Sequence, residues 1–278
     1  MADFKFQGLV GSIDRHNPFP SQFVEPRIVD IWMPPGYSEN PGQRYSVLYM
    51  HDGETAFDPS TSRFSHVDWG MDETITRLMV EGKIRPTLVV AIWSTEKRVL
   101  EYMPQKLPEG KSRERFISQI QSADGGQPAS DLYLRFIIDE LKPYIDGHYR
   151  TLPDRANTFM LGSSMGGLIT LYALCEYPNS FRGVACISTA FPIGRGIVLG
   201  YMKMNLPKAG SHKIYFDYGT KTLDKGYERS QQKADEIMLA HGYTRDVDWL
   251  TIRYDGHRHS EIDWRKRVNV PLEFLLGS

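Results

Sequence analysis

Residues 157–167 read Asn-Thr-Phe-Met-Leu-Gly-Ser-Ser-Met-Gly-Gly. An apolar, β-prone run ends in Gly162-x-Ser164-x-Gly166, and a helix-forming run over 168–177 begins at once. This order predicts a strand, a sharp turn and a helix, which is the local structure of a nucleophile elbow. The Gly-x-Ser-x-Gly spacing alone is common in loops, but here the flanking strand and helix accompany it. We therefore predict that Ser164 is a nucleophile.

The chemistry of a serine nucleophile explains this arrangement. A serine hydroxyl is weakly nucleophilic, so it must be exposed beside a base and near N–H donors for a developing oxyanion. Small residues beside Ser164 permit the strained turn, and the helix N-terminus adds positive potential. The backbone N–H of Met165 is the expected first oxyanion donor. By topology, a second N–H is expected from the loop after the strand 45–50, around Gly53 and Glu54.

Length and composition exclude several classes of protein. A chain of 278 residues can bury a full core as one large α/β domain or two small ones. The formal charge is 33 minus 34, or −1, which gives no electrostatic case for nucleic acid or an anionic membrane surface. Cys175 and Cys186 lie in apolar surroundings and are expected to be small buried hydrophobes, with a disulfide between them as the less favoured alternative. No repeat, low-complexity segment or composition break divides the chain, so one domain over 1–278 is expected.

The sequence carries no targeting or membrane signal. Residues 1–5 do not form a charged region followed by an apolar one, and no stretch is long and apolar enough to span a bilayer. A cytoplasmic location is therefore expected for the sequence as it stands, or a periplasmic or secreted one if a signal peptide has been removed. No nucleic acid or membrane partner is expected, and no signal indicates an oligomeric state.

The hydrophobic pattern predicts strands that alternate with helices after an opening antiparallel pair. Ser94 to Gln127 is polar and is expected to be an irregular loop, while 190–210 is expected to hold a short helix over the site. The pattern favours one mostly parallel sheet with N-terminal antiparallel strands and helices on both faces. The expected strands are 6–13, 27–33, 45–50, 87–93, 183–188, 213–218 and 248–254, and the expected helices are 69–81, 129–149 with a kink at Pro143, 223–241, and 260–276 with an interruption near Pro271.

A nucleophilic serine needs a histidine base, which in an α/β hydrolase follows the acid along the chain. Of the downstream histidines, His212 precedes a strand and His241 ends a helix, so neither lies at the required edge of the sheet. His257 and His259 directly follow a strand. Position alone gives His259 a modest advantage over His257.

The acid of the triad has two candidates in the loop after the strand 213–216. Asp217 lies at the strand end, whereas Asp224 follows the Gly219-Thr220 turn and can reach back toward the histidine. We favour Asp224 and keep Asp217 as the alternative, because this acid is the least constrained member of such a triad.

The sequence contains no complete motif for binding a metal or a cofactor. His51-Asp52-x-Glu54 contains residue types that bind metals, but the further ligands of a closed zinc or hard-metal site are not visible. The elbow glycines lack the Lys-Ser/Thr ending of a phosphate loop and the Gly-x-Gly-x-x-Gly of a dinucleotide fold. We expect neither a metal nor a cofactor.

Several side chains are candidates for lining a substrate pocket. Aromatic rings stack on sugars and phenols, although an aromatic at such positions is more often part of the core. Arg98 and Glu101 either line the site or form an internal pair. The aromatic candidates are Trp69, Tyr102 and Tyr218, with Phe191 as a further one.

Several motifs, in the right order, resemble the esterase D-like group of α/β hydrolases. This broad family includes the feruloyl and acetyl xylan esterases of carbohydrate esterase family one and enterochelin esterase. The resemblance runs from about residue 26 to 276. The motifs are Tyr49-Met50-His51-Asp52-Gly53-Glu54-x-x-Phe57-Asp58, Trp69-Gly70-Met71-Asp72-Glu73, Arg98-x-x-Glu101-Tyr102-x-Pro104, the elbow itself, Gly219-Thr220 followed by Asp224, and Gly256-x-x-His259-x-Glu261-x-x-Trp264.

The resemblance implies an α/β-hydrolase fold and a serine esterase with Ser164, His259 and Asp224 as its triad. It raises His259 well above His257. The acid loop is longer than in the shortest family members, which leaves Asp217 as an alternative, and Ser260 stands where asparagine is usual. The expected substrate is an acetyl or feruloyl ester of a carbohydrate. Alternatives are a siderophore or small aliphatic ester, an acyltransferase reaction, or a non-catalytic binding module.

Overall fold

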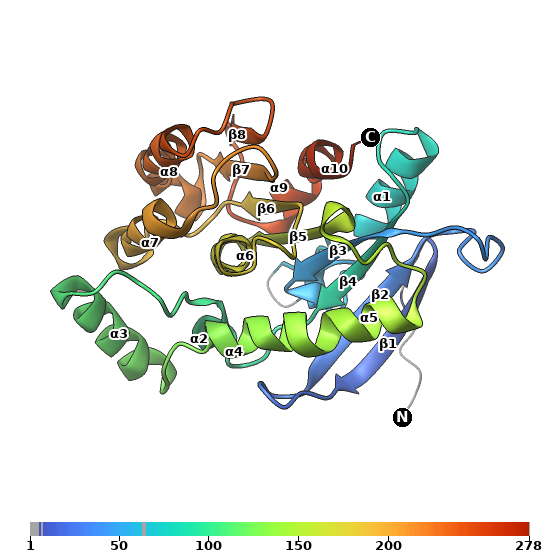
Figure 1. Cartoon of the computed structure of the whole chain (residues 1–278), viewed down its shortest axis with the longest axis horizontal. Helices are drawn as coiled ribbons and strands as arrows, with labels where there is room; N and C mark the ends of the chain where they lie inside the picture. Colours follow the sequence, from blue (N-terminus) through green and yellow to red (C-terminus); the bar gives the residue numbers. More distant parts are fainter. Residues whose placement is uncertain (1–5, 7, 63–64, 278) are drawn as a thin grey trace.

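The centre of the molecule is one eight-stranded sheet (Figure 1). The computed structural model describes residues 6, 8–62 and 65–277. The strands lie in the order β1-β2-β4-β3-β5-β6-β7-β8, and of the strand pairs among these residues only β1–β2 and β2–β4 are antiparallel. The predicted fold class, an α/β hydrolase with N-terminal antiparallel strands, is confirmed. The strands are β1 Ser12–Phe19, β2 Arg27–Met33, β3 Ser46–His51, β4 Thr87–Ile92, β5 Thr158–Ser163, β6 Gly183–Ile187, β7 Lys213–Gly219 and β8 Trp249–Tyr254.

Helices cover both faces of the sheet, because the central strands are apolar on both sides. On β5, Met160 packs in the cluster that contains the buried faces of α4 to α8, whereas Phe159 and Leu161 pack with α1, Trp264 of α9 and α10. Figure 1 shows α4 and α5 on one side of the sheet and α1 and α10 on the other. The helices are α1 Met71–Val80, α2 Arg98–Tyr102, α3 Lys111–Asp124, α4 Ser130–Arg135, α5 Lys142–His148, α6 Met165–Glu176, α7 Ile197–Asn205, α8 Glu228–Ala240, α9 Glu261–Arg265 and α10 Asn269–Leu276.

The first strand lies later than its predicted range of 6–13. Gly8 and Gly11 have positive φ angles of 70° and 92°, so the chain turns here and the strand begins at Ser12. The strand sequence is polar because β1 is at the edge of the sheet, where one side faces solvent. Arg15, for example, pairs with Asp30 of β2 at 2.7 Å.

The prediction of an irregular loop over 94–127 is wrong, because this segment contains the helices α2 and α3. Helix α3 buries only Phe116 and Ile120, so its sequence shows a weak apolar period. Helix α2 has five residues, which is too short for a periodic signal. Helix α7 is the short helix expected in 190–210.

The two predicted proline interruptions have different outcomes. A π-helical segment, η2 Phe136–Leu141, joins α4 to α5 just before Pro143. Because proline has no N–H to donate to the preceding turn, a locally widened helix accommodates it without ending. Near the C-terminus the break comes at residues 266–268, and Pro271 lies inside the first turn of α10, where the missing N–H has no helical partner to lose.

A buried ion pair attaches α2 to the sheet. The guanidinium of Arg27 on β2 donates to both carboxylate oxygens of Glu101 on α2, at 2.6 and 2.8 Å. Both residues are almost completely buried. The pair thereby positions the helix that begins with Arg98.

Replacing one member of this pair is expected to destabilise the protein strongly. Arg27→Met leaves the Glu101 carboxylate buried without its partner and is expected to lower the free energy of unfolding by about 3–5 kcal/mol. The double variant Arg27→Met/Glu101→Leu removes both charges and is expected to recover most of this loss. Urea unfolding measures both; a double variant less stable than the single one would contradict the explanation.

Candidate active site

The elbow has the backbone geometry that a presented serine requires. β5 ends at Ser163 and α6 begins at Met165, and Ser164 between them has φ 57° and ψ −118°. A positive φ is strained for a residue other than glycine and persists only where the surroundings enforce it. The N–H of Ser164 donates to the Ile187 carbonyl at 2.9 Å, and its carbonyl accepts the N–H of Ala190 at 3.1 Å.

Small residues around Ser164 are required by close backbone approach. A Cβ atom at Gly162 would lie 2.5 Å from the carbonyl oxygen of Gly166, and one at Gly167 would lie 2.8 Å from the hydroxyl of Thr189. Side chains at these positions would therefore push helix α6 away from β5 and β6. The glycines of the motif permit the tight strand-to-helix turn.

His259 and Asp224 are in direct contact. His259 Nδ1 lies 2.6 Å from Asp224 Oδ1, and both side chains are largely buried. The Thr222 hydroxyl accepts the N–H of His259 at 2.8 Å. Asp224 lies in the short 3-10 helix η5, Thr222–Gly226, that follows β7. This turn directs the carboxylate back toward the histidine loop.

The Asp224 carboxylate is held by three donors. Its Oδ2 accepts the hydroxyl of Ser188 and the N–H of Gly219, each at 2.7 Å, while Oδ1 faces His259. Burial opposes ionisation, but these hydrogen bonds and the nearby imidazole outweigh it and lower the pKa of Asp224. Asp224 is therefore held as a carboxylate.

The alternative acid, Asp217, is occupied elsewhere. Its carboxylate forms a buried ion pair with Arg267, with distances of 2.9 and 3.1 Å, and accepts the hydroxyl of Tyr215 at 2.9 Å. The alternative base, His257, is also turned toward Arg267, whose guanidinium lies 3.2 Å from its Nδ1. The structure thus brings Asp224 and His259 together, and not Asp217 and His257.

Sequence reasoning missed Ser188, which follows β6 with φ 41°. Besides donating to Asp224, its hydroxyl accepts Trp264 Nε1–H and an Arg267 N–H, each at 3.0 Å. The only available signal was its place at the carboxyl end of the strand beside β5. That signal requires the strand order, which the sequence does not state.

A cavity of about 270 Å³ opens beside Ser164 and His259. Its wall includes the Asp52–Arg98 ion pair, in which Nε–Oδ1 is 2.5 Å and Nη2–Oδ2 is 2.7 Å. Arg98 lies over the ring of Tyr102, 5.0 Å from its centroid. The described residues that line the cavity are Asp52, Thr55, Arg98, Ser163, Ser164, Leu223, His259, Glu261 and Trp264.

The predicted pocket aromatics are not among these lining residues. Trp69 is buried and stacks on Trp264 with ring centroids 5.4 Å apart. Tyr102 is fully buried, and its hydroxyl accepts the N–H of Asp52 at 3.2 Å. Tyr218 on β7 is also buried. Of the described aromatics, Trp264 reaches the cavity, and its ring meets His259 edge-on at 4.9 Å.

Two further sequence candidates also lie away from the cavity. Phe191 packs on Phe216 at 5.7 Å between ring centroids. Glu101 pairs with Arg27, so of the two charged candidates it is Arg98 that faces the cavity. Helix α7 contributes no residue to the described lining, so it does not cover this cavity.

The two expected oxyanion donors lie on adjoining segments, one at the start of α6 and one in the turn after β3. Met165 is the first residue of α6, where N–H groups have no partner within the helix. Glu54 lies in the 3-10 turn η1, Gly53–Thr55, after β3, and its carboxylate accepts the N–H of Ser94 at 2.9 Å. A Cβ at Gly166 would lie 3.2 Å from Asp52 Oδ2, which shows how closely the elbow approaches this loop.

A family model matches this chain over residues 21–255 and is described as "Putative esterase". The match covers most of the sheet, the elbow and the Asp224 turn. The chain belongs to this esterase family. The protein is therefore a carboxylic ester hydrolase. Within the part of the chain that the structure describes, no helix is long and apolar enough to cross a membrane.

Individual relatives of the esterase are distant in sequence. An endo-1,4-beta-xylanase/feruloyl esterase of Xylanibacter ruminicola is 23% identical over 85% of this chain, which spans only 27% of that protein. A ferulic acid esterase of Anaeromyces mucronatus has a TM-score of 0.68 at 20% identity and covers 98% of this chain and 92% of its own. The enterobactin esterase of Shigella flexneri has a TM-score of 0.69 at 19% identity, covering 97% and 60%. At these identities the solved structures establish the fold.

His51 stands at the end of β3, immediately before the loop that carries Glu54. It is buried, with Nδ1 2.9 Å from the hydroxyl of Tyr133 and Nε2 3.2 Å from the sulfur of Met160. Burial is the main cause that lowers the pKa of His51 to about 3. The ring is thus an uncharged structural part of the esterase near neutral pH.

His51 is expected to make the esterase sensitive to acid. Between about pH 6.5 and 3 the unfolded chain binds a proton at His51 that the folded chain does not, so stability falls as pH falls. On lowering the pH from 7 to 5, the wild type is expected to lose about 2 kcal/mol more than His51→Asn. Urea unfolding at both pH values measures the difference, and equal losses in the two proteins would refute it.

Proposed function

We propose that the esterase cleaves its substrate through a serine acyl-enzyme, with Ser164 as nucleophile, His259 as base and Asp224 as the acid behind it. The observation that carries the proposal is the 2.6 Å contact between His259 Nδ1 and Asp224 Oδ1, beside a cavity that both Ser164 and His259 line. Asp224 accepts the Nδ1 proton, which leaves His259 Nε2 as the basic atom.

The reaction follows from these roles. Ser164 Oγ attacks the ester carbonyl carbon while His259 Nε2 takes the hydroxyl proton. The carbonyl oxygen becomes an oxyanion that the N–H groups of Met165 and Glu54 stabilise. His259 then gives its proton to the departing alcohol, and the acyl group remains on Ser164. Water, deprotonated by His259, attacks this second ester, and the carboxylic acid leaves as Ser164 regains its proton.

We further propose an acetyl or feruloyl ester of a carbohydrate as the substrate. Trp264 and Leu223 give the cavity an apolar side suited to an acyl or aryl group, and the Asp52–Arg98 pair gives it a polar side suited to sugar hydroxyls. The names of two relatives, a xylanase/feruloyl esterase and a ferulic acid esterase, support this choice. The enterobactin esterase neighbour supports a catecholate ester as the second candidate.

The serine mechanism is tested by a substrate panel of p-nitrophenyl acetate, methyl ferulate, acetylated xylan and a catecholate ester. The wild type is expected to be most active on the ferulate or the acetylated xylan. Ser164→Ala is expected to lower kcat on every substrate by a factor on the order of 10⁴ or more. Equal turnover by the two proteins would eliminate the serine mechanism, and a preference for the catecholate ester would select the second candidate.

The base and the acid each have a neighbouring control residue of the same type. Asp224→Asn is expected to lower kcat by about 10⁴, because the amide favours the wrong imidazole tautomer, and His259→Ala is expected to abolish activity similarly. His257→Ala and Asp217→Asn are expected to lose far less activity per folded molecule. Steady-state kinetics with circular dichroism separates catalysis from folding. If either control variant loses as much as its counterpart, the assignment of that role is wrong.

A further inference from the structure

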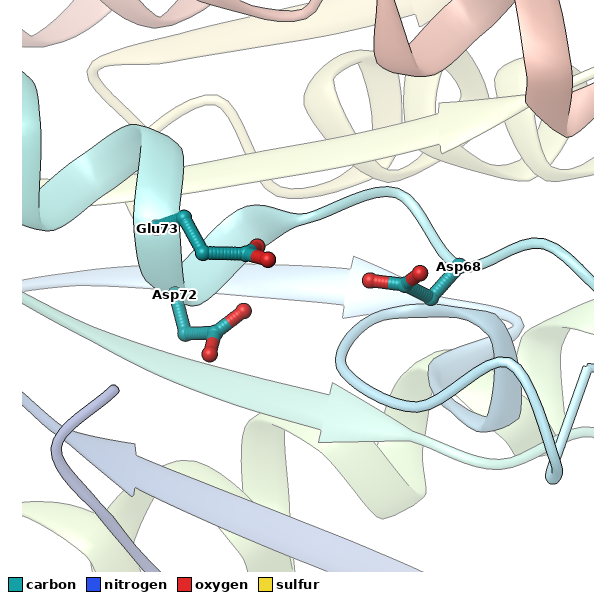
Figure 2. Close-up of side chains that lie close together, drawn as sticks. All are labelled: Asp68, Asp72 and Glu73. Carbon is teal, nitrogen blue, oxygen red and sulfur yellow. The ribbon is translucent and has the colours of Figure 1, made fainter. Parts of the chain in front are cut away.

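A cluster of three carboxylates lies outside the cavity, at the start of α1 (Figure 2). Asp68 lies in the loop before this helix, and Asp72 and Glu73 lie in its first turn. One oxygen from each carboxylate lies within 4.8 Å of the other two. Figure 2 shows Glu73 and Asp68 pointing toward each other, with the Asp72 carboxylate beside them.

One cation on the protein already contacts this cluster. Arg265 of α9 pairs with Asp68 at 2.6 Å and with Glu73 at 3.0 Å. Asp68 also accepts the N–H of Gly70 at 2.9 Å. Three carboxylates against one guanidinium leave the cluster with a charge of −2 when all are ionised. A single divalent cation would balance that charge.

Asp72 provides an independent observation that points to a ligand. It is 1% exposed, and its Oδ2 accepts the N–H of Val10 at 2.8 Å. Its Oδ1 is buried and has no hydrogen-bond partner among the described residues. The neighbouring Glu73 carboxylate is also an acceptor, so a contact between the two carboxylates needs a proton or a cation between them.

We propose that Asp68, Asp72 and Glu73 bind a hard divalent cation, with water completing its coordination. Carboxylate oxygens are the ligands that such cations prefer. Ca²⁺ fits better than Mg²⁺, because it accepts irregular geometry and more ligands, whereas Mg²⁺ demands a near-ideal octahedron. Glu73 is partly exposed, so the site is open to solvent on one side and can accept water ligands.

The cation would connect the loop before α1 to the helix after His259. Trp69, next to Asp68, stacks on Trp264, and Arg265 follows Trp264 in α9. Trp264 in turn contacts His259 and donates to Ser188. By neutralising the three carboxylates, the cation would hold the loop before α1 against α9. It would do so without contacting the reacting atoms. The bound ion is therefore a structural one, and its effect is on stability.

Direct binding measurements test the site. Calorimetry of chelator-treated esterase with Ca²⁺ is expected to show one saturable site with a Kd of about 10⁻⁴ M, weaker binding of Mg²⁺, and a Tm that rises with Ca²⁺. Tb³⁺ is expected to displace Ca²⁺ and to luminesce on tryptophan excitation, since Trp69 adjoins Asp68. These readouts do not depend on the ester-cleaving mechanism, so either proposal can fail alone.

Two variants and a control locate the site. Asp72→Asn keeps the side-chain shape and the acceptor for Val10, and Glu73→Gln changes a partly exposed residue, so both are expected to fold and to weaken Ca²⁺ binding at least tenfold. Glu81→Gln, at the other end of α1 and paired with Lys83, is the matched control and is expected to bind as the wild type does. Absence of saturable binding, or unchanged affinity in both cluster variants, would overturn the site, and tighter binding of Mg²⁺ would overturn the choice of Ca²⁺.

Discussion

The strained backbone of Ser164 is the constraint on which the site depends. A positive φ at this serine is maintained because its N–H and carbonyl bond to the backbone that leaves β6, and because glycines permit α6 to approach β5. The same hydrogen bonds fix the position of Ser188 one residue further on. β5 and β6 lie side by side and end at the same edge of the sheet. Their ends therefore position both Ser164 and the Ser188 hydroxyl that donates to Asp224.

Most of the fold follows from residue patterns that burial imposes. The central strands are apolar runs because both faces are covered, and their ends were predicted to within one or two residues. The errors fall where burial is partial. β1 is polar because it is an edge strand, and α3 buries only two apolar side chains, so neither produces a clear period. The single domain expected over 1–278 stays a prediction, although all eight described strands join one sheet.

The candidate site was less accessible to sequence reasoning than the fold. The elbow has a local signature, and family resemblance favoured His259, but position alone barely separated it from His257. The aromatic candidates Trp69, Tyr102 and Tyr218 are buried, because an apolar pattern indicates burial and does not say whether a ring borders a cavity. Ser188 was missed because a single hydroxyl at a strand end has meaning only once the strand order is known. The roles themselves stay predictions until activity is measured.

The pairing of Asp217 with Arg267 has a consequence for the neighbouring carboxylate. Both acceptor positions of the Ser188 hydroxyl are taken, by Trp264 and Arg267, so its proton can point only toward Asp224. Asp217 supplies the counterion of this arginine, and the Ser188 hydroxyl lies between the guanidinium and Asp224. The two aspartates that are alternative acids in the sequence thus have different partners. Asp217 pairs with the Arg267 guanidinium, and Asp224 faces the His259 imidazole.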